Sequence, residues 1–142
     1  MKNYFNISKL KNIVFLGTSQ IFEELSLVNK NLDLNTVIVT TRMQAKNMKN
    51  YKKYDYNIFD KLDKKFEKFI KSKVDINETL FFSLGSRWIF SKKQIDSFFK
   101  NKLINFHGSR LPVDGGGGSF SWRIMKNDRI NIILFHLVTD KI

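Results

Sequence analysis

The sequence predicts one α/β domain over residues 1–142, built on a Rossmann-like, mostly parallel sheet with helices on both faces. Short apolar segments rich in β-forming residues alternate along the chain with helical patterns, and no internal repeat or low-complexity linker interrupts them. Two of these segments end in a glycine, Gly17 and Gly85, as strands do where they enter a tight turn. A chain of 142 residues that is 42% hydrophobic is long enough to bury a core.

The first predicted strand covers Lys11–Thr18, because KNIVFLGT has the apolar pattern of a strand buried on both faces. Ser19 is suited to cap the helix that follows. Apolar residues of this helix follow helical spacing: Ile21, Phe22, Leu25 and Val28. Thr36–Thr40 (TVIVT) predicts a second strand, and the basic, Asn-rich stretch after it predicts a short helix and a loop.

Asp60 is predicted to open a helix with its apolar residues on one face: Leu62, Phe66, Phe69 and Ile70. Thr79–Leu84 (TLFFSL) predicts another buried strand. Ser91 and Gln94 have the spacing of a capping box and predict a further helix. Its apolar residues are Ile95, Phe98 and Phe99.

Three elements are predicted for the end of the chain. Leu103–Phe106 is a short strand, Ser119 caps a helix, and Ile130–Val138 is a long apolar strand. In a sheet of this kind, functional groups gather in loops at the carboxyl ends of the strands, and the informative residues of this chain fall there.

The composition narrows the class of protein. The net charge is +12, which can attract nucleic acid or anionic membranes. The lysines are scattered, however, and over Asp60–Lys71 they alternate with Asp63 and Glu67 on a predicted solvent-facing surface. A solvated surface is therefore favoured over a nucleic-acid surface.

Nothing in the sequence indicates export or a membrane. With no Cys, the chain has neither disulfides nor a thiolate zinc site. No apolar run approaches the roughly 18 residues of a membrane span. The start, MKNYFNISKLKN, lacks the apolar core of a signal peptide, so a cytoplasmic protein is expected.

The turn after the first strand excludes two common cofactors. Gly17-Thr18-Ser19 contains one glycine, whereas a dinucleotide site has G-x-G-x-x-G, and no P-loop motif is present. NAD and ATP are therefore rejected as leading cofactors. Gly17 permits a tight turn, and the loop is expected to border the substrate.

The segment over 105–122 (NFHGSRLPVDGGGGSFSW) concentrates unusual residues. Asn105 and His107 lie two apart at the end of a strand, so both side chains can project to one face. Gly115–Gly118 lead into a helix N-terminus, which can bind anions. Each feature alone fits a flexible connector with an ordinary loop histidine, but their combination in this order favours a functional site.

Asn105-Phe-His107-Gly-Ser109 followed by Leu111-Pro112, a glycine cluster and a helix resembles the signature of the 10-formyltetrahydrofolate-dependent formyltransferases. That family reads Asn-x-His-x-Ser-Leu-Leu-Pro, and includes enzymes that formylate methionyl-tRNA, glycinamide ribonucleotide and amino sugars on nucleotide carriers. The resemblance extends to IVFLGT and to Leu80–Ile89, and so covers nearly the whole chain.

The resemblance implies roles for three groups, with 10-formyltetrahydrofolate as the formyl donor and no metal. Asn105 would donate a hydrogen bond to the oxyanion that forms when an amine attacks the formyl carbon. His107 would stabilise the same charge as an imidazolium, or protonate the departing folate nitrogen. An Asp would keep His107 protonated and help to remove the proton of the amine.

The position of that Asp is the main departure from the family. Asp140 is the only acidic residue near the expected place. An ungapped alignment from His107 onward places the family's Asp at position 143, one residue past Ile142, so the catalytic domain is expected to be incomplete at its C-terminus. We keep Asp140 as the candidate within this chain, and expect weak or absent activity from an incomplete triad.

The resemblance also implies two binding segments. Ser86, Arg87, Trp88 and Ile89 would hold the pterin ring of the folate through backbone hydrogen bonds, although Trp88 fits a core position equally well. Arg110 stands where Leu is common, and Gly115 replaces a basic residue, so the pocket for the amine is expected to differ from that of most of the family. The candidate substrate-binding residues are Gly17, Thr18, Ser109, Arg110, Gly116 and Gly117.

Several functions stay open on the sequence alone. The acceptor is expected to be a small-molecule amine, preferably an amino-sugar nucleotide because of the glycine tract, with methionyl-tRNA as the alternative. A catalytically inactive fragment that keeps a folate or nucleotide pocket is a second class, and a basic nucleic-acid-binding domain is a third. A metal site at His136 and Asp140 is not expected, because their spacing suits a helix whereas the segment reads as a strand and a loop.

Overall fold

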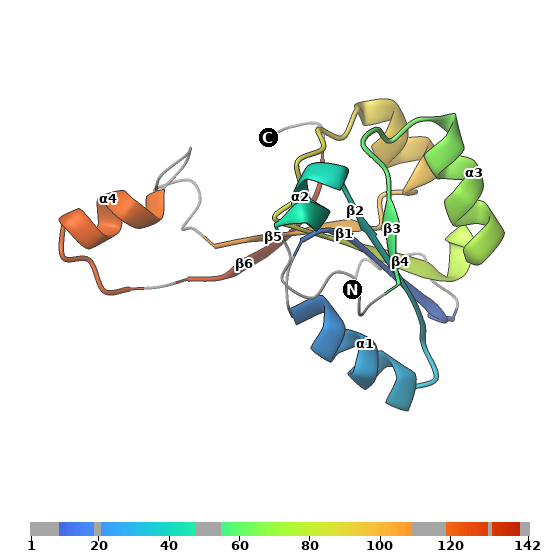
Figure 1. The fold of residues 1–142 in the computed structure, drawn as a ribbon, viewed down its shortest axis with the longest axis horizontal. Helices are drawn as coiled ribbons and strands as arrows, with labels where there is room; N and C mark the ends of the chain where they lie inside the picture. Colours follow the sequence, from blue (N-terminus) through green and yellow to red (C-terminus); the bar gives the residue numbers. More distant parts are fainter. Residues whose placement is uncertain (1–8, 19–20, 48–54, 109–118, 131, 140–142) are drawn as a thin grey trace, which may run out of the picture.

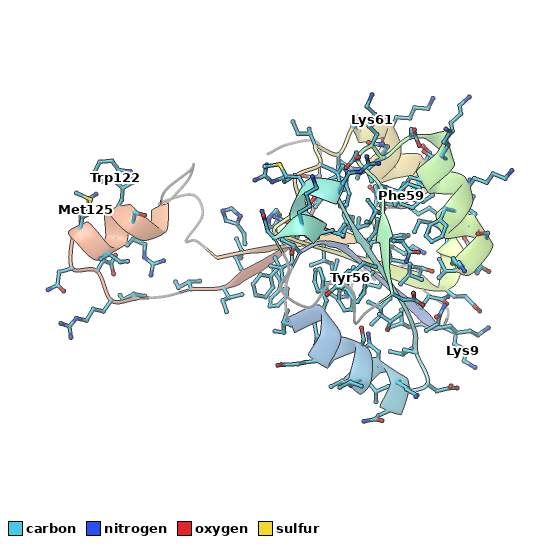
Figure 2. The ribbon with its side chains drawn as sticks, in the orientation of Figure 1. Lys9, Tyr56, Phe59, Lys61, Trp122 and Met125 are labelled. Carbon is cyan, nitrogen blue, oxygen red and sulfur yellow. The ribbon has the colours of Figure 1, made fainter. Side chains whose placement is uncertain are left out.

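A computed structural model of the chain describes residues 9–18, 21–47, 55–108, 119–130 and 132–139. Its centre is a six-stranded sheet in the order β3-β2-β1-β4-β5-β6 (Figure 1). The first five strands are parallel, and β6 runs antiparallel to β5. This confirms the predicted Rossmann-like, mostly parallel α/β fold.

The predicted elements are present with small shifts in their bounds. The strands are β1 (Asn12–Gly17), β2 (Asn35–Thr40), β3 (Tyr56–Ile58), β4 (Thr79–Leu84), β5 (Leu103–His107) and β6 (Leu134–Leu137). The helices are α1 (Ile21–Asn31), α2 (Arg42–Lys46), α3 (Lys64–Lys73) and α4 (Ser119–Met125), with a 3-10 turn η2 (Ile76–Glu78) and a π-helix η3 (Gln94–Phe98). The short edge strand β3 was not predicted.

Helices cover both faces of the sheet, as predicted. On one face, the ring of Phe15 in β1 stacks on Phe22 of α1 with centroids 4.7 Å apart. On the other face, a larger core gathers Phe66 of α3, Phe81 of β4 and Phe98 of η3, all buried. Figure 1 shows α1 and α3 on opposite sides of the strands. Because β1 is covered on both sides, it is buried along its whole length.

The helix predicted to open at Asp60 begins later, at Lys64. The carboxylate of Asp63 accepts hydrogen bonds from the backbone N–H groups of Lys65 (2.9 Å) and Phe66 (3.1 Å), so Asp63 is the N-cap. Asp60 instead accepts from the backbone N–H of Arg42 at 2.9 Å, and ties the start of α2 to this loop.

The capping box predicted at Ser91 and Gln94 is confirmed. The Ser91 hydroxyl accepts from the Gln94 N–H at 3.3 Å, and the Gln94 side-chain oxygen accepts from the Ser91 N–H at 3.0 Å. Two residues with left-handed backbone, Lys100 and Asn101, follow the helix and turn the chain into β5.

The last strand is shorter than the predicted Ile130–Val138. β6 spans only Leu134–Leu137, because Leu134 pairs with His107, the final residue of β5. Ile133, one residue before β6, therefore lacks a partner strand and is 55% exposed. In the described part of the chain, no helix reaches the length and apolarity that crossing a bilayer requires.

Candidate functional site

Three chain segments meet at the carboxyl edge of the sheet. In the register of the strands, Gly17 of β1 pairs with Leu84 of β4, and Leu84 pairs with Phe106 of β5. The loop after β1, the loop after β4 and the end of β5 therefore lie at one level. Of the described candidates, Gly17 and His107 end strands at this edge, and Thr18 follows Gly17 directly; their roles stay predictions.

Asn105 lies inside the sheet, in the middle of β5. Its parallel neighbour is Ser83 of β4 and its antiparallel neighbour is His136 of β6. Strands on both sides therefore fix its backbone, and its side chain is half-buried. The side-chain amide nitrogen of Asn105 lies 3.3 Å from Nε2 of His136.

The contact between Asn105 and His136 suits one tautomer of the imidazole. An amide nitrogen only donates, so Nε2 of His136 accepts in the tautomer that carries its proton on Nδ1. Nδ1 lies 3.2 Å from the backbone oxygen of Leu137, which accepts that proton's hydrogen bond. The amide of Asn105 keeps a second N–H available for another acceptor.

His107 is the last residue of β5 and is half-buried. It lies two residues after Asn105, so both side chains leave the strand on the same face. An amide donor and a titratable imidazole therefore stand side by side at the edge where the loops meet. That pair can stabilise a developing negative charge and move a proton.

The loops after β1 and β4 touch through their backbones. Thr18 N–H donates to the carbonyl oxygen of Leu84 at 3.0 Å. Gly17 has φ +122°, and a Cβ placed on it would lie 2.0 Å from that same oxygen. Gly85 has φ +59°, and its Cβ would lie 3.1 Å from the Thr18 oxygen. The approach at Gly17 leaves no room for a Cβ, whereas at Gly85 a Cβ would be tight and its positive φ favours glycine.

The four candidate pterin-binding residues have different surroundings. Trp88 packs partly buried against the larger core, and its backbone N–H donates to the Ser86 hydroxyl at 3.2 Å. The indole N–H of Trp88 is buried without a partner among the described residues. Arg87 is exposed and contacts Met43 of α2, and Ile89 is 95% exposed. Trp88 is thus partly a core residue, while its neighbours face solvent.

The remaining candidates lie outside the described residues: Ser109, Arg110, Gly116, Gly117 and Asp140. Their roles remain sequence-based expectations. In the parts of the chain that the structure does describe, no three His, Asp or Glu side chains come close enough to hold a metal ion.

A hollow of about 750 Å³ opens at the opposite, amino edge of the sheet. Its lining includes lysines that already have partners. Lys11 Nζ lies 2.8 Å from the Glu78 carboxylate, and Lys100 Nζ donates to the Asn77 side-chain oxygen at 2.5 Å. These contacts explain the lysines as parts of the surface structure, and the hollow is distant from Asn105 and His107.

Lys102 is buried beneath that edge. Its ammonium group donates to the backbone oxygens of Ile76 and Asn77, the latter at 3.0 Å. Burial lowers the pKa of Lys102 from its usual 10.5; the charge of Lys100 adds to this, and that of Asp75 opposes it. The side chain therefore anchors the 3-10 turn to β5.

Sequence reasoning missed two residues at the carboxyl edge. His136 was considered only as a metal ligand, yet the strand register brings it to Asn105. Gln44 of α2 was not singled out, although its side chain reaches the loop after β4. A polar residue in an apolar strand was a usable signal for His136, whereas nothing in the basic stretch distinguished Gln44.

Fold and site together define a Rossmann-like α/β domain with an amide and an imidazole near the carboxyl end of β5, and in such sheets ligands bind at the carboxyl ends of the strands. Among solved structures, the chain is similar to a phosphoribosylglycinamide formyltransferase from Brucella melitensis, with a TM-score of 0.65 and 16% identity over 94% of this chain and 74% of that one. The corresponding enzyme from Anaplasma phagocytophilum gives a TM-score of 0.68 and 17% identity over 95% of this chain and 67% of that one.

A formyltetrahydrofolate deformylase from Pseudomonas syringae pv. tomato has a TM-score of 0.62 and 14% identity; the match covers 95% of this chain and 48% of that one. The chain thus spans about three quarters of the first transferase and about half of the deformylase. No family model and no curated protein matches the sequence. At these identities the likeness establishes a shared fold, the one that the sequence motif implied.

Proposed function

We propose that this domain transfers a formyl group from 10-formyltetrahydrofolate to the amino group of a small molecule. The supporting observation is the pair Asn105 and His107, side by side at the end of β5 and level with the loop Gly85–Ile89. The same fold is found in solved formyltransferases and formyltetrahydrofolate deformylases.

The residues of β5 fit the chemistry of this transfer. The amine nitrogen forms a bond to the formyl carbon, and the carbonyl electrons move to the oxygen. The free N–H of Asn105 donates to that oxyanion, and the neighbouring imidazolium of His107 adds a positive charge. When the bond from carbon to the folate nitrogen breaks, His107 gives that nitrogen a proton. The carboxylate for which Asp140 is the candidate takes the proton that the amine loses.

The loop Ser86–Ile89 is the proposed folate-binding segment, with Gly17 and Thr18 facing the acceptor. Glycinamide ribonucleotide is the acceptor of the solved transferases that the fold resembles. Our sequence-based preference for an amino-sugar nucleotide rests on Gly116 and Gly117, and methionyl-tRNA is the alternative acceptor.

The test is single-turnover formyl transfer with protein in excess, because these conditions report the transfer step without requiring product release. Protein and 10-formyltetrahydrofolate labelled with ¹³C in the formyl group are incubated separately with glycinamide ribonucleotide, an amino-sugar nucleotide, methionyl-tRNA and buffer alone. Mass spectrometry follows the label. We expect a formylated small-molecule amine above the uncatalysed background.

Two variants separate catalysis from folding. Asn105→Ala removes the oxyanion donor and is expected to lower the rate by about 10²–10³. The control Asn57→Ala removes a comparable bond, from the Asn57 amide to the Ile38 oxygen at 3.1 Å, in the distant edge strand β3. Equal rates for the wild type and Asn105→Ala contradict the proposed role, and label in free formate alone identifies a hydrolase.

A further inference from the structure

The helix α2 crosses the end of a neighbouring strand to reach the proposed folate loop. It follows β2, and β1 separates β2 from β4 in the sheet. Nevertheless, side chains of α2 contact the residues directly after β4. In Figure 1, α2 lies at the end of the sheet where these strands finish.

Gln44 makes the first of these contacts. It is 5% exposed, and its side-chain N–H donates to the backbone oxygen of Gly85 at 2.6 Å. Its side-chain oxygen accepts from the Thr41 hydroxyl at 3.0 Å, and that hydroxyl accepts from the Gln44 backbone N–H at 3.2 Å. Because the side-chain oxygen accepts from Thr41, rotation of the amide group by half a turn would break both its bond to Thr41 and its bond to Gly85.

Arg87 makes the second contact, from the loop back to α2. Its guanidinium lies 3.2 Å from the sulfur of Met43. The two contacts therefore flank Ser86, one on each side. Further along the loop, Trp88 packs partly buried against the larger core, whereas Ile89 is 95% exposed.

We propose that α2 is the support of the folate-binding loop, with Gln44 as a positioning residue that orients the peptide following Gly85. A ligand held by backbone hydrogen bonds requires each peptide of the loop to point in a fixed direction before it arrives. The bond to Gly85 fixes the first of those peptides and leaves Ser86–Ile89 free to face the ligand. The choice of folate as that ligand rests on the proposed function; the support of the loop by α2 rests on the contacts alone.

The test compares Gln44→Glu with the wild type in two measurements. The carboxylate keeps the size of the side chain but replaces the donor with an oxygen that faces the Gly85 oxygen. We expect the Kd of 10-formyl-5,8-dideazafolate, a stable folate analogue, to rise about tenfold by calorimetry. We also expect faster amide hydrogen exchange over residues 86–89. Gln44→Met, which lacks the donor without adding charge, takes the place of Gln44→Glu if that protein does not fold.

Asn35→Asp is the matched control. The Asn35 amide donates to the Asn12 side chain (3.1 Å) and to the Lys73 backbone oxygen (3.3 Å), at the opposite end of β2. It is expected to leave both the Kd and the exchange over 86–89 unchanged. A folded Gln44 variant that binds the analogue as tightly as the wild type overturns the proposal.

The two proposals fail in different ways. If the wild type does not bind the analogue, the proposed function is wrong, and the hydrogen exchange of the Gln44 variant still decides the role of α2. Faster amide exchange over residues 86–89 then favours the proposed role of α2, and unchanged exchange overturns it.

Discussion

Replacing Gly17 by Ala tests whether the contact between the loops after β1 and β4 is as close as the structure shows. An alanine at this position has two costs. Its backbone must keep φ +122°, which side chains disfavour, and its Cβ would lie 2.0 Å from the Leu84 oxygen and 2.9 Å from the Ser86 nitrogen. The backbone must therefore move.

The expected loss of stability follows from these contacts. Holding a residue other than glycine in a disfavoured backbone region costs about 1–3 kcal/mol. Moving the Leu84 carbonyl also weakens the hydrogen bond that it accepts from Thr18, worth about 1 kcal/mol. Together these give about 2–4 kcal/mol, which lowers the Tm of a domain of this size by roughly 10 °C.

Two other glycines calibrate the measurement. Gly85 has φ +59° and a tight but not overlapping neighbour at 3.1 Å, so Gly85→Ala is expected to cost about 1–2 kcal/mol. A Cβ on Gly108 meets nothing within 4 Å, so Gly108→Ala is expected to change stability by less than about 0.5 kcal/mol. The assay is urea unfolding followed by circular dichroism, with Tm as a second measure.

The order of the three variants decides the outcome. We expect the loss to rise from Gly108→Ala through Gly85→Ala to Gly17→Ala. A Gly17→Ala protein as stable as Gly108→Ala would refute the close approach of the two loops.

Three further predictions concern single side chains. Asp63→Ala removes the N-cap of α3 and is expected to lower the free energy of unfolding by about 1 kcal/mol in urea. Because burial lowers the pKa of Lys102 below 10.5, the unfolded chain binds this proton more tightly than the folded one. The free energy of unfolding is therefore expected to rise as the pH approaches 10.5. Lys102→Met is expected to remove that part of the rise, measured by unfolding at about pH 8 and about pH 10. His136 is expected to carry its proton on Nδ1 when neutral, and ¹⁵N NMR of this chain with two histidines checks it; the Nε2–H tautomer would contradict the bond from Asn105.

The sequence predicted the sheet well, because its central strands are continuous apolar segments that end in glycine or a polar turn. Elements stabilised from outside their own segment were harder to predict. β3 has three residues and pairs only with β2 among the described strands, so its pattern is too short to detect. The prediction that α3 opens at Asp60 was wrong, because Asp60 bonds to the backbone N–H of Arg42 while Asp63 caps the backbone N–H groups of Lys65 and Phe66.

The sequence could predict the site residues that are neighbours on one strand. It could not predict those that meet only through the register of different strands or the path of a helix. Asn105 and His107 are neighbours along one strand, so their spacing placed them together. Contacts of His136 and Gln44 arise between segments 31 and 41 residues apart, respectively, and no local pattern encodes them. Such contacts depend on how strands align and how a helix crosses the sheet, which are tertiary properties.

The pairing of β6 with β5 makes the surroundings of Asn105 sensitive to insertions far from it. A shift of β6 by one residue would turn His136 to the other face of the sheet and bring Phe135 or Leu137 opposite Asn105. The amide would then face a hydrocarbon side chain, without any change in β5. A change in the length of segment 126–133 that shifts this register would therefore alter the hydrogen bonding of Asn105 even when Asn105 and His107 are retained.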